Sequence, residues 1–152
     1  MKVCTSKSAW KGFLRRAKRA HPLEHVEALW GHETVDTFRI AKFAPIRLGD
    51  PTKGAEPNDP EVDGLYYTRK EAKRQKKLAK EAGMTFLGTV HTHPHIDHEH
   101  VPSETDHIIA VKDGEKMMGI VHLYKPKRSA RFQCTVRWWF PQQPLLFEIL
   151  ED

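Results

Sequence analysis

The stretch His91-Thr92-His93-Pro94 follows directly on an apolar run, Met84 to Val90, that has the length of a β-strand. Side chains at positions i and i+2 of a strand point to the same side, so this strand would present two imidazoles together at its end. Pro94 has no amide hydrogen, which favours an exit from the sheet at that point. The pattern therefore predicts a paired-histidine site where a strand ends.

A carboxylate further along the chain can complete this pair as a metal site. Nine residues, 94–102, separate the histidines from Ser103-Glu104-Thr105-Asp106, in which Ser103 can cap a short helix whose first turn carries Asp106. Two imidazoles and one carboxylate leave the fourth position of a zinc ion open for water, which is typical of catalytic zinc. We therefore predict one zinc ion per chain, bound by His91, His93 and Asp106. Alone, Ser103 and Asp106 are better explained as a helix-capping pair, so the order of all four features carries the interpretation.

Length and composition restrict the class of protein. A chain of 152 residues with 39% hydrophobic and 30% charged residues is typical of a single globular domain, here taken as 1–152. Its apolar runs are far shorter than the roughly 20 residues that span a bilayer, and the segment 1–7 does not resemble a secretory signal. Cys4 and Cys134 cannot form a disulfide framework or a four-cysteine zinc site. We expect reduced thiols, a cytoplasmic location and no membrane contact.

Hydrophobic periodicity predicts both helices and strands. One apolar stripe of a helix over about 8–20 is formed by Trp10, Phe13, Leu14 and Ala17, and we expect it to pack on a sheet. A second helix is expected from Thr68 to about 82, and a short one at Ser103. Strands are expected at 26–30, 35–43, 84–90, 117–124, 132–138 and 145–150, with a turn at 31–33 and a loop at 49–64. This order predicts an α+β domain with a mixed sheet.

The order of the site residues resembles the JAMM motif of the JAB/MPN/Mov34 metalloproteases. That motif is an upstream glutamate, His-Ser/Thr-His-Pro, a loop and Ser-x-x-Asp. The likeness extends to Pro22–Gly31, where Pro-Leu-Glu leads into an apolar strand that ends in glycine, and to Gly83–Pro94. It covers most of residues 8–140, although only the motif is specific. The resemblance implies a JAB/MPN-like domain with a mixed, mainly antiparallel sheet flanked by helices, and zinc-dependent hydrolysis of a peptide or isopeptide bond.

The resemblance also implies a role for each matching residue. His91, His93 and Asp106 would be the zinc ligands. Glu24 would take a proton from the attacking water, and Ser103 would donate a hydrogen bond to the developing oxyanion.

Two positions depart from the family pattern. The loop before Ser103 has nine residues where seven are usual, and it carries further histidines that are either exposed polar groups or secondary metal or substrate contacts. Glu27 stands where the family often has glycine, which makes it a rival to Glu24 as the base. The spacing between Glu24 and Gly31 matches the family, and this favours Glu24.

Charge gives weaker information about partners. The net charge is +5, and residues 69–80 carry seven Lys or Arg against one acidic residue, Glu71. This helix is either an ordinary solvated face or a docking surface for an acidic partner. The substrate would be a protein or peptide, with ubiquitin-like and sulfur-carrier proteins as candidate classes. Alternative functions are a non-catalytic interaction module on the same fold or a basic nucleic-acid-binding module, but the helix lacks the interleaved aromatic residues that stack on bases.

Overall fold

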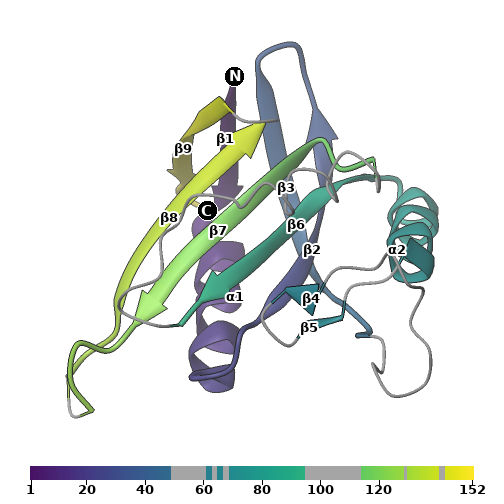
Figure 1. Cartoon of the computed structure of the whole chain (residues 1–152). Coiled ribbons are helices and arrows are strands. Elements are labelled where there is room, and N and C mark those ends of the chain that lie inside the picture. Colours follow the sequence, from purple (N-terminus) through teal and green to yellow (C-terminus); the bar gives the residue numbers. More distant parts are fainter. Residues whose placement is uncertain (49–60, 63–64, 67–68, 95–113, 129, 141–142) are drawn as a thin grey trace.

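The computed structural model describes residues 1–48, 61–62, 65–66, 69–94, 114–128, 130–140 and 143–152 (Figure 1). Two helices and nine strands follow one another along the chain in this part. They are β1 (Lys2–Ser6), α1 (Lys7–Ala20), β2 (Val26–Glu33), β3 (Thr37–Pro45), β4 (Glu61–Val62), β5 (Leu65–Tyr66), α2 (Arg69–Glu81), β6 (Thr85–His93), β7 (Met117–Tyr124), β8 (Gln133–Phe140) and β9 (Gln143–Leu150).

Seven strands form a closed barrel in the order β1-β3-β2-β6-β7-β8-β9, and β4 and β5 form a separate pair. Strand β2 is antiparallel to β3 and β6, and β8 is antiparallel to β7 and β9. Parallel pairs join β1 to β3 and β9, and β6 to β7. The predicted α+β class with a mixed, mainly antiparallel sheet is therefore confirmed. Closure through β1 was not predicted, because a five-residue strand that pairs with distant segments has no local signature.

Helix α1 fills the inner side of the barrel. The Ser6 hydroxyl caps it by accepting a hydrogen bond from the amide of Ala9 at 3.2 Å. Trp10 and Phe13 are buried among aromatic and aliphatic side chains of the strands, and Leu14 packs at the margin, as the apolar stripe predicted. We call the cluster the α1 core; its buried members include Val3, Leu29, Phe38, Phe43, Leu87, Val90, Val121 and Trp138.

Helix α2 packs on the opposite face of β2 and β6. Its buried alanines, Ala72 and Ala79, contact Ala28, Trp30 and Phe86, and we call this cluster the α2 core. The helix ends near Gly83, whose φ of 74° is the left-handed conformation that glycine adopts at little cost. Among helices in the described ranges, none is long and apolar enough to cross a membrane.

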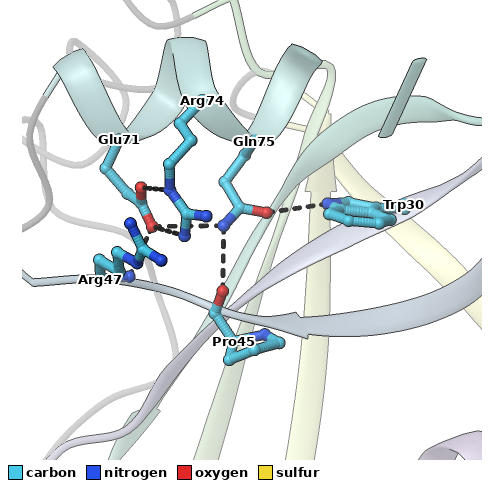
Figure 2. Close-up of polar contacts among 6 residues, drawn as sticks. All are labelled: Trp30, Pro45, Arg47, Glu71, Arg74 and Gln75. Carbon is cyan, nitrogen blue, oxygen red and sulfur yellow. Dashed lines mark hydrogen bonds and ion pairs between the residues drawn. The ribbon is translucent and has the colours of Figure 1, made fainter. Parts of the chain in front are cut away.

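A buried polar network attaches α2 to β2 and β3 (Figure 2). The Gln75 side chain, which is fully buried, accepts a hydrogen bond from Trp30 Nε1 at 2.9 Å and donates one to the carbonyl of Pro45 at 3.0 Å. Glu71 pairs with Arg74 and accepts a hydrogen bond from the Arg47 amide. Because each of these groups is satisfied, the network orients the helix without leaving a polar atom of Gln75 unpaired.

A β-bulge in β6 decides which way the histidines face. Leu29 of β2 pairs with Gly88, whereas its neighbour Trp30 pairs with Phe86, so Leu87 is an extra residue. Leu87 and Val90 consequently both point into the α1 core although they are three residues apart. A Cβ at Gly88 would lie 1.8 Å from the carbonyl oxygen of Met117, so glycine is required for this close approach to β7.

The predicted turn at residues 31–33 is wrong, because β2 continues to Glu33. The reversal lies at 34–36, where the Thr34 amide donates a hydrogen bond to the carbonyl of Thr37 at 2.8 Å. Gly31 serves the strand pairing rather than a turn, since a Cβ there would lie 1.9 Å from the carbonyl oxygen of Arg39. The loop predicted over 49–64 is likewise interrupted by β4, and the helix predicted at Ser103 lies outside the described residues.

Candidate functional site

His91 and His93 come together at the end of β6, as their spacing predicted. Their Nε2 atoms are 3.2 Å apart, and the ring of His91 is buried. Two imidazole nitrogens on one tetrahedral zinc ion, each about 2.05 Å from it, would be separated by about 3.3 Å. The two side chains therefore fit a shared metal ion.

Glu24 belongs to the same face of the sheet as the two histidines. In the antiparallel register of β2 and β6, Val26 pairs with His91 and Glu27 pairs with Val90. Continued by two residues, this register brings Glu24 opposite His93. Paired residues point to the same face and successive residues alternate, so Glu24 and Val26 share a face with the imidazoles. The Glu24 side chain is buried, with 8% of its surface exposed.

The segment that carries Glu24 is attached on both sides of His93. The His25 amide donates a hydrogen bond to Thr92 Oγ1 at 2.8 Å, and the Thr92 amide donates one to the carbonyl of His25 at 2.9 Å. On the other side of His93, His21 Nε2 lies 3.3 Å from the carbonyl of Pro94. Glu24 therefore sits in a short segment whose two ends are held against the residues that flank His93.

Glu27 faces the other way, into the α1 side of the sheet. Its carboxylate is 2% exposed and accepts two hydrogen bonds from Arg16 of α1, from Nε at 2.9 Å and Nη2 at 2.8 Å. His25 Nε2 approaches the same carboxylate at 2.5 Å. Burial alone would raise the pKa of Glu27, but these hydrogen bonds and the positive charge of Arg16 lower it overall. This orientation favours Glu24 over Glu27 as the base beside the histidines.

A pocket of about 320 Å³ opens beside Glu24, between the start of β2 and the chain that follows β3. Its apolar lining is formed by Val26, Phe43, Pro45, Ile46 and Leu48, and its polar lining by Glu24 together with Arg16, His25 and Glu27. A pocket of this kind could receive an apolar side chain of a bound polypeptide.

His122 is a neighbour of His93 that the sequence did not single out. The parallel register of β6 and β7 pairs His93 with His122, which is buried and stacks on Tyr124 with ring centroids 4.3 Å apart. The only local signal is one histidine in an otherwise apolar strand. Its relation to His93 depends on the pairing of two strands that a long connection separates.

The other predicted site residues lie outside the described part of the chain. These are Ser103, Asp106 and the histidines of the loop 94–102 that follow Pro94. Within the described residues, His, Cys, Asp and Glu side chains do not gather into any group of three that could hold a metal ion. Asp106 as the third ligand and Ser103 as the oxyanion donor thus remain predictions.

Cys4 and Cys134 are both free thiols.

A barrel carrying paired histidines and a buried glutamate at one end defines a JAB/MPN-type domain, and comparison with known families agrees. The prokaryotic homologs of the JAB domain match residues 6–135, and the chain belongs to this family. The resemblance found in the sequence is therefore confirmed. Among curated proteins, none matches the sequence significantly.

Solved structures share the fold along nearly the whole chain. The solution structure of a protein from Desulfitobacterium hafniense has a TM-score of 0.64 at 18% identity, over 99% of this chain and 94% of that one. A JAB1/MPN domain protein from Archaeoglobus fulgidus has a TM-score of 0.55 at 22% identity, over 99% and 100%. A structure described as a metalloprotease-like zinc site in the proteasome and signalosome has a TM-score of 0.52 at 19% identity, over 99% and 100%.

The Glu27 network predicts a stability that depends on pH. Because the folded-state pKa of Glu27 lies below the usual value of 4.5, its contribution is complete above that value and is lost as pH falls through the folded pKa. We expect Glu27→Gln to lower the unfolding free energy by about 2 kcal/mol at pH 7. The difference in unfolding free energy between the wild type and the variant, called the gap below, should narrow below pH ~4. Urea unfolding between pH 7 and pH 3.5 measures this gap.

The matched control is Glu148→Gln, which removes an ion pair with Lys2 in which both side chains are about half exposed. Its effect on the unfolding free energy should be small at every pH, because water screens an exposed ion pair. A Glu27→Gln penalty that is equally small at pH 7 would contradict the prediction.

Proposed function

We propose that this chain is a zinc-dependent hydrolase that cleaves a peptide or isopeptide bond in a protein substrate. The observation that carries the proposal is the convergence of the His91 and His93 Nε2 atoms, 3.2 Å apart at the end of β6. Glu24 supports it, because the register of β2 and β6, continued by two residues, sets Glu24 opposite His93. Membership of the JAB family and likeness to a structure described as a metalloprotease-like zinc site support it.

Each residue has a distinct part in this chemistry. A bound zinc ion would supply a Lewis acid and lower the pKa of water toward neutrality. His91 and His93 would hold the ion through the Nε2 atoms that face each other, with Asp106 as the third ligand. Glu24 would accept the proton of the attacking water and pass it to the leaving amine. Ser103 would donate a hydrogen bond to the oxyanion.

The surroundings of Glu24 suit proton transfer. Its side chain is buried beside a pocket, and the segment that bears it is attached to both flanks of His93. Such attachment keeps the base at one distance from the reacting groups, which is what positions a general base for transfer. We expect the substrate to be a ubiquitin-like or sulfur-carrier protein. We also expect the chain itself to be cytoplasmic.

A groove between α2 and β3 is our proposed contact surface for an acidic partner. It has a volume of about 290 Å³, with an apolar floor that includes Trp30, Ile46 and Leu78. Its rim carries Lys42, Arg47 and Arg74, and Lys42 lies over the Trp30 ring at 4.9 Å. Beside the rim, the outer face of α2 exposes five lysines: Lys70, Lys73, Lys76, Lys77 and Lys80.

This cationic surface also supports the alternative function, a non-catalytic interaction module on the same fold. In that case binding would require α2 but neither the histidines nor Glu24. The two functions therefore differ in which residues they require, and the next variants separate them.

Metal binding is the first test of the enzyme proposal. We expect the purified chain to bind one zinc ion, and His93→Ala to lose it because one of two converging imidazoles is removed. Elemental analysis after dialysis measures the metal content. His32→Ala, at an exposed position of β2, should retain the full content. A wild-type chain that binds no zinc would contradict the proposal.

Glu24→Gln tests the base directly. The amide keeps the shape of the side chain but cannot take a proton, so hydrolysis should fall about 10²–10⁴-fold while zinc stays bound. Glu27→Gln is the matched change three residues along and should lose far less turnover, because the amide oxygen can still accept the hydrogen bond from His25. Turnover is measured on a panel of ubiquitin-like fusion proteins. If Glu24→Gln retains near-normal turnover, the assignment is wrong; an inactive, zinc-loaded Glu27→Gln would move the role to Glu27.

The acidic-partner surface is tested by reversing its charge. We expect the double variant Lys73→Glu, Lys77→Glu to weaken binding of an acidic ubiquitin-like fusion about tenfold at low salt, with the difference shrinking at 0.5 M salt as the charges are screened. The double variant Lys127→Glu, Arg128→Glu, at two exposed positions after β7, changes the net charge by the same amount and is the control. Isothermal titration calorimetry measures the affinity of each variant for the fusion protein. Equal losses of affinity in the α2 variant and the control would argue against a specific surface.

A further inference from the structure

His25 connects the two faces of the sheet at the site. Its side chain points to the α1 side, where the ring of Phe13 lies 6.1 Å from it and Glu27 is bound at 2.5 Å. Its backbone exchanges hydrogen bonds with Thr92, the residue between the two histidines of β6. The side chain of His25 is therefore bound on the α1 side of the sheet, while its backbone pairs with the end of β6 that carries His91 and His93.

The polar network of Arg16, Glu27 and His25 on the α1 side does not stabilise the fold more than apolar packing at the same place would. Glu27 occupies a position whose neighbours on that face are Leu29 and Val90, both fully buried apolar residues. A buried charge pays a desolvation cost that an apolar residue of similar size would avoid, and such pairs are often neutral for stability. The carboxylate of Glu27 instead orients its neighbours, because it accepts hydrogen bonds from Arg16 on one side and from His25 on the other.

Holding His25 restrains Glu24, His91 and His93 together. These three residues lie on the face opposite Glu27, and within the described residues the bond from the Thr92 amide to the His25 carbonyl is the backbone hydrogen bond that extends the β2–β6 pairing beyond Val26 and His91. End pairs of a strand fray unless something beyond the ladder restrains them. The side-chain hydrogen bond from His25 to Glu27 supplies that restraint from the core side.

We propose that the Glu27–His25 pair is a positioning device that holds Glu24 and the His91–His93 strand end in one arrangement before any metal binds. Neither residue is catalytic, because both side chains lie on the α1 side of the sheet. The proposal rests on the proposed function only for its consequence, which is faster turnover. The restraint itself is a property of the metal-free chain.

The experiment compares three variants of the full chain. His25→Leu removes the hydrogen bond to Glu27, His25→Gln keeps a side-chain N–H that can donate to it, and His32→Leu makes the same chemical change at an exposed position of β2, the strand that follows His25. Amide hydrogen exchange of the metal-free proteins, followed by NMR, is measured for Thr92 and normalised to Leu29 in the middle of β2. This ratio removes any change in global stability.

In His25→Leu, the Thr92 amide should exchange about tenfold faster relative to Leu29, whereas His25→Gln and His32→Leu should match the wild type. Zinc affinity, measured by competition with a chromophoric chelator, should fall about tenfold in His25→Leu only, which is the effect typical of residues that orient metal ligands. With a cleavable substrate, kcat should fall while KM is unchanged.

Unchanged Thr92 exchange in a folded His25→Leu protein would overturn the proposal. So would Thr92 exchange that is as fast in His25→Gln as in His25→Leu. Failure of the proposed function has a different signature. In that case the wild type binds no zinc or cleaves no fusion protein, while Thr92 exchange still depends on His25.

Discussion

The antiparallel pairing of β2 with β6 is the interaction on which the rest of the site depends. Its hydrogen bonds place Val26 beside His91, and by continuation Glu24 beside His93. The bulge at Leu87 and Gly88 sets the phase of β6, so that Val90 enters the α1 core and the histidines face the other side. In a strand that alternated regularly, Leu87 and His91 would share a face, and with Leu87 in the α1 core the imidazoles would point into the barrel.

Strand β2 also anchors both helices through buried polar groups, one on each face. On the inner face, Glu27 binds Arg16 of α1; on the outer face, Trp30 binds Gln75 of α2. In each case the polar pair lies among apolar residues that supply most of the burial, so its contribution is orientation as much as stability. A strand whose two faces are both fixed to helices is a rigid support for a site at its end.

The departure from the family pattern at Glu27 acquires a physical explanation in this setting. A glycine leaves the α1 face of the strand without a side chain, whereas Glu27 reaches both Arg16 and His25. The lowered pKa of the Glu27 carboxyl makes it a weaker proton acceptor than an ordinary carboxylate, so it serves as a hydrogen-bond acceptor for Arg16 and His25. A structural carboxylate and a candidate base can therefore lie three residues apart without competing for one role.

The sequence alone determined the elements with strong local patterns: α1 from its apolar stripe, α2 with its terminal Gly83, the strands from β6 to β9, the paired histidines and the family. Tertiary structure decided what joins distant segments, namely closure of the barrel through β1, the bulge at Gly88 and the alignment of His122 with His93. Gly31 shows why: its local pattern favours a turn, but the close approach of Arg39 from the next strand requires a glycine inside β2. Periodicity reports which residues of a segment share a face, whereas register, bulges and the direction in which that face points depend on partners that are remote in sequence.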